Sequence, residues 1–258
     1  MTATLITGAS SGIGLELARV FAKHRHDLVL VARTEPKLRE LAQEAQASGV
    51  RAHVIPADLS APGAVQALTD RVQALGVDVD ILVNNAGYGL FGSFVETPLD
   101  VELSMIQLNI VALTELTKRL LPGMVARKSG RILNLASTAA FFPGPLMAVY
   151  YATKAYVLSF SEAIATELEG TGVTVTALCP GPTASGFQAA ANLELSKLVA
   201  GKRLPTARSV AEAGYEALMA GRTVVVPGVS NKLTVLAPRI MPRRLMAKIV
   251  QKAQEPRR

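Results

Sequence analysis

The chain of 258 residues has the length of one large α/β domain. Half of its residues are hydrophobic and 18% are charged, so it can bury a sizeable core, which excludes a wholly disordered protein. The single cysteine, Cys179, cannot form an intrachain disulfide, and the three histidines show no metal-ligand spacing. Because no signal-peptide pattern or bilayer-spanning apolar stretch is present, we predict a cytoplasmic protein without a metal site.

The positive charge is concentrated at the end of the chain. There are 27 Lys and Arg residues against 20 Asp and Glu residues, and nine of these cations but only one acid, Glu255, fall in residues 222–258. The preceding part is nearly neutral. We therefore expect a dinucleotide-binding catalytic domain over 1–230 and a basic C-terminal extension over 231–258.

Apolar runs of strand length alternate with stretches of helical periodicity along the chain. Strands are expected to begin at Ala3, Asp27, Ala52, Asp80, Arg131, Val173 and Thr223. Several of these runs are continuously apolar, which is typical of strands buried on both faces. The alternation predicts one doubly wound α/β domain of the Rossmann type, with a seven-stranded, mostly parallel sheet and helices on both faces.

Two segments depart from the simple alternation. The expected helix from Pro98 to Leu121 has two apolar stripes, which indicates burial against both the sheet and a second subunit. Between residues 187 and 205 the periodicity weakens, and we interpret this segment as a lid over the site. Its apolar residues are Leu193, Leu195, Leu198 and Val199.

A glycine-rich loop follows the first expected strand. Residues 7–14 read Thr-Gly-Ala-Ser-Ser-Gly-Ile-Gly and precede a helical stretch. Gly8, Gly12 and Gly14 allow a sharp turn and a close approach of the backbone to a pyrophosphate at the helix N-terminus. An ordinary glycine-rich turn is the alternative, but the position between the first strand and first helix favours a dinucleotide site.

Five motifs together resemble the classical short-chain dehydrogenase/reductase family, in the family's order over about the first 185 residues. They are the loop at 7–14, Asn84-Asn85-Ala86-Gly87, Asn109 with Ser137, Tyr150-x-x-x-Lys154, and Pro180-Gly181. The resemblance implies a bound nicotinamide dinucleotide. The cofactor-binding residues expected are Gly8, Ser10, Ser11, Gly12, Ile13, Gly14, Arg33, Asp58, Leu59, Asn85, Ala86, Gly87, Tyr150, Lys154, Pro180, Gly181 and Thr183.

The residue at the end of the second expected strand indicates which dinucleotide is bound. Where an acid would accept from the ribose 2′-hydroxyl of NAD, this chain has Arg33, whose guanidinium can hold the 2′-phosphate of NADP. We therefore favour NADP(H) over NAD(H), with a surface arginine as the alternative. The resemblance places Asp58 against the adenine, although Asp58 could equally cap the helix that follows. Either Thr183 or Ser185 could contact the nicotinamide carboxamide.

The catalytic residues expected are Asn109, Ser137, Tyr150 and Lys154. Tyr150 and Lys154 are four residues apart and share a helix face. The positive charge of Lys154 and of the nicotinamide ring should lower the pKa of Tyr150 and enable proton transfer. Ser137 would hold the substrate oxygen, and the resemblance implies that Asn109 orders a relay water. Two neighbours, Tyr151 and Thr138, are expected to point elsewhere.

The reaction expected is hydride transfer between nicotinamide and a hydrophobic ketone, aldehyde or secondary alcohol, with Tyr150 as proton donor or acceptor. The substrate-side residues are mostly apolar: Tyr88, Leu90, Phe91, Phe141, Phe142, Pro143, Met147 and Phe187. A non-catalytic NADP(H)-binding regulator on the same fold is the alternative. We expect a homodimer or homotetramer without nucleic-acid binding. The basic tail should dock on the protein itself, with peripheral membrane contact as the less favoured interpretation because Pro238 and Pro242 interrupt a long helix.

Overall fold

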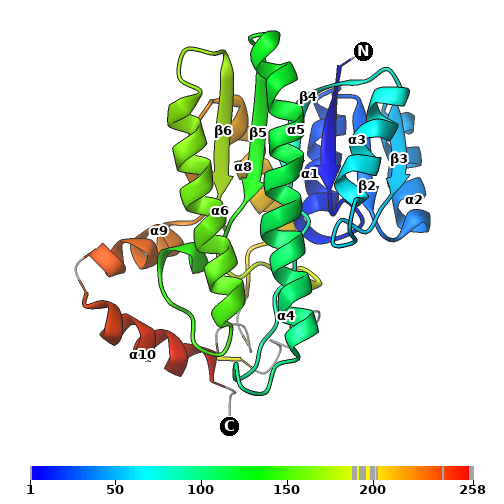
Figure 1. Ribbon diagram of the computed structural model, residues 1–258. Helices are drawn as coiled ribbons and strands as arrows, with labels where there is room; N and C mark the ends of the chain where they lie inside the picture. Colours follow the sequence, from blue (N-terminus) through cyan, green and yellow to red (C-terminus); the bar gives the residue numbers. More distant parts are fainter. Residues whose placement is uncertain are drawn as a thin grey trace.

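The computed structural model describes residues 2–187, 191, 196–197, 201, 203–239 and 241–255. Its centre is a sheet of seven strands in the order β3-β2-β1-β4-β5-β6-β7, and every neighbouring pair is parallel (Figure 1). The predicted seven-stranded α/β fold is therefore confirmed. The chain reverses its direction of winding between β1 and β4, and in such sheets ligands bind outside the carboxyl ends of the strands at that point.

Each strand begins within two residues of its predicted start. The strands are β1 Thr2–Thr7, β2 Leu28–Ala32, β3 Ala52–Pro56, β4 Asp78–Asn84, β5 Gly130–Leu135, β6 Val173–Leu178 and β7 Val224–Val225. Every residue of β2 is buried, as its continuous apolar run predicted. Burial on both faces follows from helices that cover both sides of the sheet.

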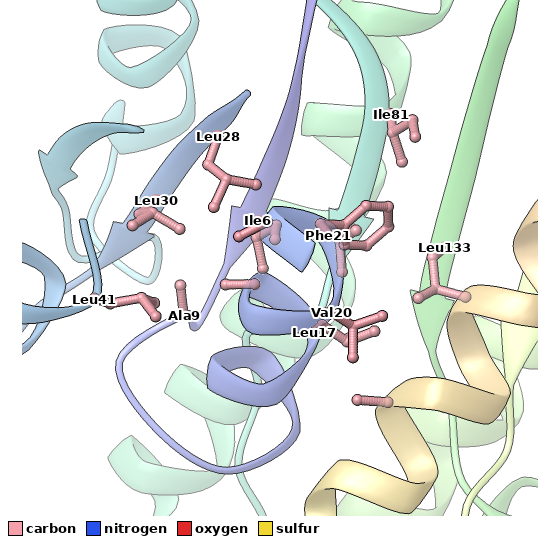
Figure 2. Packing of buried hydrophobic residues seen from close by; sticks show 14 of the residues in the cluster. Ile6, Ala9, Leu17, Val20, Phe21, Leu28, Leu30, Leu41, Ile81 and Leu133 are labelled. Atoms are coloured by element: carbon pink, nitrogen blue, oxygen red, sulfur yellow. The ribbon is translucent and has the colours of Figure 1, made fainter. Parts of the chain in front are cut away.

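One face of the sheet is covered by α1 Gly12–Lys23, α2 Glu35–Ala47 and α8 Ala207–Met219. Figure 2 shows Leu17, Val20 and Phe21 of α1 packed against side chains from several strands. Phe21 is completely buried in this cluster. Because α1 begins where β1 ends, this packing fixes the position of the glycine loop that joins them.

The other face is covered by α3 Ala64–Ala74, by the long helix that ends at Ala126, and by α6 Ala148–Glu167. Side chains alternate between the two faces along each strand, as the two-residue period of a strand requires. Leu5 and Leu82 point to this second face, whereas their neighbours Ile6 and Ile81 point to the first.

The predicted helix over Pro98–Leu121 is present but is not a regular α-helix. It consists of α4 Leu99–Ile106, a π-helical segment η1 Gln107–Ala112, and α5 Leu113–Ala126. A π-helical turn widens the helix and re-aims the side chains within it, and such turns occur frequently at functional sites. Asn109 lies in the middle of η1.

The last part of the chain lies beyond the carboxyl ends of the strands (Figure 1). It forms α9 Val229–Leu236, the short 3₁₀ turn η3 Ala237–Arg239, and α10 Arg243–Gln254. Met246 and Val250 of α10 are buried in a cluster that contains Tyr150 and Tyr151. The basic extension therefore packs against the rest of the chain, and the separation of a domain over 1–230 from a tail over 231–258 stays a proposal.

Much of the predicted lid over 187–205 lies outside the described residues, including Leu193, Leu195, Leu198 and Val199. Its described ends make contacts at the site: the Phe187 and Tyr150 ring centroids are 5.4 Å apart, and the amide of Phe91 donates to the carbonyl of Ala191. Within the described part of the chain, no helix has the length and apolar character needed to cross a membrane.

Candidate active site

A cavity of about 740 Å³ opens at the carboxyl ends of the strands. It runs from the loop after β1, past the ends of β2 and β3, to the first two turns of α6. All the predicted site residues except Gly14 and Asn109 line this cavity. The structure therefore brings together motifs that are up to 175 residues apart in the sequence, from Gly8 to Thr183.

The glycine loop has the backbone conformation that glycine alone adopts easily. Gly8 and Gly12 have φ of +66° and +56°, in the left-handed region. A side chain at Gly14 would overlap the amide of Asn85 and the carbonyl of Gly8. Gly14 therefore serves close packing of the helix against the neighbouring loops, and its part as a cofactor contact stays a prediction.

The loop leads into the exposed donors of a helix N-terminus. The N-cap of α1, Ser11, makes no side-chain hydrogen bond to the first turn, and that turn carries no acidic residue. Ser11, Gly12 and Ile13 line the cavity. The N–H groups of the first turn are thus available to an anionic group, and the helix dipole favours negative charge there.

Thr7 and Asn85 hold the loop against the end of β4. The backbone amides of Asn85 and Ala86 both donate to Thr7 Oγ1 at 3.0 Å. Asn85 Nδ2 donates to the carbonyls of Thr7 at 2.9 Å and Gly8 at 3.2 Å. Asn84 instead points into the interior, where its Nδ2 donates to Thr117 and Asn134. Of the two asparagines, only Asn85 therefore shapes the cavity.

Arg33 and Asp58 lie at the far end of the cavity, and both side chains are exposed. Asp58 accepts hydrogen bonds from the Ser60 amide at 3.0 Å and the Ser60 hydroxyl at 2.6 Å. The Ser60 hydroxyl contributes most to lowering the pKa of Asp58 below its usual range, with a smaller effect from Arg33. Asp58 caps this turn and not α3, whose N-cap is Gly63, so the helix-cap alternative is wrong.

Tyr150 and Lys154 are both buried on the cavity side of α6. Lys154 Nζ donates to the carbonyl of Leu135 at 2.7 Å and lies 5.8 Å from the centre of the Tyr150 ring. Burial lowers the pKa of Lys154 to about 8. Burial also raises the pKa of Tyr150 to about 12, while the Ser137 side chain acts in the opposite direction.

This direction is opposite to the lowering of the Tyr150 pKa that the sequence interpretation expected from Lys154 together with the nicotinamide ring, and the joint effect of these two charges stays a prediction. In the protein alone, the loss of hydration outweighs the hydrogen bond to Ser137, because a buried phenol is penalised for ionising. At neutral pH Tyr150 therefore keeps its proton, and its hydroxyl is a donor.

Ser137 lies two residues beyond β5 and caps the short 3₁₀ helix η2 Thr138–Phe141. Its Oγ accepts a hydrogen bond from the Ala139 amide at 3.1 Å. We expected the Thr138 side chain to point away from that of Ser137 because the two residues would belong to an extended strand. The chain instead turns into η2 at Thr138, so this reason is wrong. Thr138 also lines the cavity, although its side chain is buried.

Asn109 is buried behind the cavity wall. Its Oδ1 accepts from the Tyr88 amide at 3.2 Å, and its Nδ2 donates to the Tyr88 carbonyl and to Thr153 Oγ1, both at 3.0 Å. Thr153 in turn donates to the Tyr150 carbonyl at 2.7 Å. Asn109 thus joins the loop after β4 to the helix that carries Tyr150, and its part in a proton relay stays a prediction.

Other parts of the wall differ from the expected set. Of the eight apolar substrate-side residues, four line the cavity: Tyr88, Phe142, Met147 and Phe187. Thr183 and Ser185 both line it, so the choice between these two hydroxyls stays open.

Burial raises the pKa of Cys179 to about 12, which keeps it a neutral thiol. Within the described residues, no cluster of His, Cys, Asp or Glu side chains could hold a metal.

Sequence reasoning missed several residues of the wall. Gly228, Ser230, Asn231 and Thr234 of the α9 region line the cavity, and so does Arg203, which was not singled out within the predicted lid segment. They lie outside the recognised motifs, so no spacing signal could have found them. Tyr151, which was expected to point elsewhere, also lines the cavity, and its hydroxyl accepts a hydrogen bond from Gln254 at 2.8 Å.

The comparisons with known proteins agree with this geometry. The family model described as short chain dehydrogenase matches residues 2–196, which covers the glycine loop, Ser137, Tyr150 and Lys154. The chain belongs to this family. It is therefore an oxidoreductase of the short-chain dehydrogenase/reductase type, with a nucleotide cofactor.

Two curated relatives are similar over different shares of their lengths. A short chain dehydrogenase of Pseudocercospora fijiensis is 38% identical over 183 residues, which are 70% of this chain and 59% of that protein. The ketoacyl reductase HetN of Nostoc sp. is 34% identical over 238 residues, which are 92% of this chain and 82% of HetN. The chain thus spans about three fifths of the first relative and most of the second.

Solved structures of this family cover the whole chain. A short-chain dehydrogenase of Sphingobium yanoikuyae in complex with NADPH is 31% identical, with a TM-score of 0.82 over 99% of this chain and 98% of that one. A short-chain dehydrogenase/reductase of Burkholderia phymatum in complex with NAD is 25% identical, with a TM-score of 0.81 over 100% and 96%. Relatives of this fold therefore use either dinucleotide.

Proposed function

We propose that the protein transfers hydride between NADP(H) and a hydrophobic ketone, aldehyde or secondary alcohol, with Tyr150 as the proton donor or acceptor. The observation that carries the proposal is the burial of Tyr150 and Lys154 beside Ser137 on the wall of one large cavity. The bound nicotinamide would supply or accept the hydride.

The features of the cavity fit a dinucleotide. The N–H groups of the first turn of α1 would bind the pyrophosphate, and the positive φ of Gly8 and Gly12 would let the backbone approach it. Asp58 and Leu59 would contact the adenine, and Lys154 would donate to the nicotinamide ribose. Pro180, Gly181 and Thr183 would hold the nicotinamide end, while Ser10, Ala86 and Gly87 would complete the wall.

Arg33 favours NADP(H) over NAD(H). It lies at the end of β2 with an exposed side chain on the cavity rim, and no described residue forms an ion pair with it. A free guanidinium at this position can bind a 2′-phosphate bidentately. The NADPH complex of the Sphingobium relative supports this assignment, and the NAD complex of the Burkholderia relative makes it a question for experiment.

In the reducing direction the substrate oxygen would accept hydrogen bonds from Ser137 and Tyr150. Tyr150 holds its proton at neutral pH, because burial raises its pKa to about 12. It can therefore deliver the proton as negative charge develops on the oxygen, which is the role of a general acid. The Ser137 hydroxyl, kept in place by the Ala139 amide, would stabilise the same oxygen.

The apolar wall points to a hydrophobic substrate. Phe142, Met147 and Phe187 line the part of the cavity next to Tyr150. Burial of apolar substrate surface there would contribute about 25 cal/mol per Å² to binding. The names of similar proteins include a ketoacyl reductase and a 7β-hydroxysteroid dehydrogenase, and an apolar wall would suit a ketoacyl or steroid substrate.

The experiment is a panel of ketones, aldehydes and secondary alcohols assayed with NADPH, NADH and their oxidised forms. We expect turnover of bulky apolar carbonyl compounds with NADPH, and a kcat/KM with NADH at least tenfold lower. Small charged carbonyl compounds serve as the matched negative set. Turnover that prefers charged substrates would contradict the proposed substrate class, and equal use of NADH would contradict the proposed cofactor.

A further inference from the structure

Helix α9 has two faces of different character. On one side Ser230, Asn231 and Thr234 line the cavity. On the other, Val229, Leu233 and Leu236 are between 48% and 75% exposed. Their spacing of four and three residues places these three side chains on one stripe of the helix. A surface helix usually packs its apolar face against the protein and exposes its polar face to solvent. Helix α9 has the reverse arrangement.

Helix α10 also has a buried side and an exposed side. Met246, Val250 and Gln254 are buried against the domain, and Gln254 donates to the Tyr151 hydroxyl. Leu245 and Ile249 are 47% and 44% exposed. Each of these two residues precedes a buried residue, Met246 or Val250, by one position. Because successive residues of an α-helix are rotated by 100° about its axis, Leu245 and Ile249 lie to one side of the docked face. Docking of the tail therefore leaves an apolar stripe uncovered.

Cations accompany the exposed apolar side chains. Lys232 of α9 and Arg244, Lys248 and Lys252 of α10 are all exposed. None of the four forms an ion pair with another described residue, although Lys197 pairs with Glu255 nearby. Glu255 is the one acidic residue after residue 221. The exposed sides of α9 and α10 therefore each combine apolar side chains with uncompensated positive charge.

We propose that the exposed faces of α9 and α10, here called the C-terminal face, bind the surface of an anionic lipid bilayer. Apolar side chains would enter the boundary between headgroups and acyl chains, and the lysines and Arg244 would contact the lipid phosphates. Pro238 and Pro242 do not oppose binding to a bilayer. They divide the segment into two short helices that lie at the same end of the molecule (Figure 1).

Charge decides between a membrane and a second copy of the chain. A symmetric contact through the C-terminal face would bring two positively charged surfaces together, and repulsion between them would oppose it. Nucleic acid would satisfy the cations, but it would leave the stripe of Val229, Leu233 and Leu236 in water. An anionic bilayer satisfies both the charges and the apolar stripe.

The proposal does not depend on the reaction that the cavity catalyses. It does have a geometric consequence, because α9 separates the cavity from the C-terminal face. Binding to a bilayer would therefore place the wall formed by Ser230, Asn231 and Thr234 directly behind the lipid contact.

The test is flotation of the full chain with vesicles at physiological salt. Vesicles of phosphatidylcholine with phosphatidylglycerol should carry the protein upward, whereas pure phosphatidylcholine should not. Two variants separate the contributions of charge and apolar contact. Lys248→Gln/Lys252→Gln should weaken binding to the anionic vesicles by about 30-fold, from about 1 kcal/mol per cation. Leu233→Gln/Ile249→Gln should weaken it by about tenfold.

Matched controls change the same kinds of residue elsewhere. Lys23→Gln/Lys37→Gln removes two exposed lysines from α1 and α2, and Leu75→Gln/Val95→Gln replaces two exposed apolar side chains. Both controls should float like the unchanged protein. All four variants replace exposed residues, so their melting temperatures should stay within a few degrees and confirm that each is folded.

Several outcomes would overturn the proposal. One is a protein that stays out of the floating fraction with both lipid compositions. Another is flotation that the two control variants weaken as much as the two test variants do. A third is a protein that binds duplex DNA but not vesicles, and a fourth is a C-terminal face whose variants alter only the oligomeric state measured by sedimentation.

Discussion

Tyr150 and Lys154 are two ionisable side chains held in a buried position next to the cavity. Each is shifted by burial toward its neutral form, Tyr150 with a raised pKa and Lys154 with a lowered one. A buried lysine without a carboxylate partner destabilises the folded state as long as it is charged. Such a cost is typical of active sites, where stability is lower than the fold could provide.

We expect Lys154→Met to stabilise the protein at pH 7 while abolishing activity. On folding, the pKa of Lys154 falls from 10.5 to about 8, so the charged lysine lowers the stability of the folded state by about 3 kcal/mol. The variant also loses the hydrogen bond to Leu135, which offsets about 1 kcal/mol of this gain. Below pH 8 the lysine is charged in both states and the penalty is full. Between pH 8 and 10.5 only the unfolded chain keeps the proton, so the wild type gains stability as pH rises.

Urea unfolding of both proteins at pH 7 and above pH 10 checks this prediction. The free-energy difference between Lys154→Met and the wild type should favour the variant by about 2 kcal/mol at pH 7. It should reverse to a slight advantage for the wild type above pH 10.5, where only the hydrogen bond remains. A variant less stable than the wild type at pH 7 would contradict the account of Lys154 as a penalised charge.

Arg33 provides a second prediction for a single residue. Arg33→Asp should remove a charge-assisted contact and add repulsion toward the 2′-phosphate, weakening NADPH binding by about 10- to 100-fold. The loss of affinity should not exceed 100-fold, because Arg33 is exposed and solvent screens its charge. NADH, which lacks the phosphate, should lose much less affinity. Fluorescence titration of both cofactors measures the two changes, and an equal loss for NADH and NADPH would show that Arg33 does not read the phosphate.

Among the elements, the orientation of α10 decides which of its side chains pack against the domain and which belong to the C-terminal face. Met246→Ala/Val250→Ala removes two buried side chains and should lower the free energy of unfolding by about 2–5 kcal/mol. Leu245→Ala/Ile249→Ala changes the exposed stripe of the same helix and should cost about 1 kcal/mol or less. The reverse order of the two costs in urea unfolding would mean that α10 is docked by its other face.

The strands could be predicted because burial on both faces leaves a mark in the sequence. The run Leu28-Val-Leu-Val-Ala32 is apolar throughout, and β2 has these bounds. The π-helical segment Gln107–Ala112 could not be predicted, since one widened turn alters the helical periodicity too little. The helix around Asn109 was therefore expected to be regular, and its hydrogen bonds to Tyr88 and Thr153 were not anticipated.

The site could be predicted where its residues belong to motifs with fixed spacing. Tyr150, Lys154 and the glycine loop all line the cavity. The contact between Gln254 and Tyr151 joins residues 103 positions apart, and nothing in the local sequence of either residue indicates it. The effect of burial on the pKa of Tyr150 was also not anticipated, because desolvation depends on the packing around the ring and cannot be read from the order of residues.

At the scale of the whole molecule, a second surface carries exposed apolar side chains. Leu99 and Leu103 of α4, Val111 of η1 and Tyr156 of α6 are each more than one third exposed, and a shallow hollow beside Val111 and Tyr156 is lined by Ile110 and Thr114. We interpret this surface as the symmetric subunit interface that the two-sided Pro98–Leu121 helix indicated.

Val111→Asp should therefore shift the protein toward the monomer, because two buried carboxylates would face each other across a two-fold contact. Sedimentation measures the assembly, with Leu75→Asp as a control on the exposed end of α3. The control should keep the wild-type assembly. A wild type that already sediments as a monomer, or a Val111→Asp variant that keeps the assembly, would contradict this assignment of the interface.

In the reaction that we propose, Tyr150 and not the adjacent Tyr151 transfers the proton, with NADP(H) as the cofactor. Single-turnover reduction of a substrate found in the carbonyl panel, measured with Tyr150→Phe and Tyr151→Phe, tests it most directly. Tyr150→Phe should lower the rate by about 100- to 10,000-fold while its NADPH affinity stays near the wild-type value. Tyr151→Phe, which loses only its contact with Gln254, should retain most of the rate. A full rate with Tyr150→Phe, or a collapse confined to Tyr151→Phe, would contradict the account.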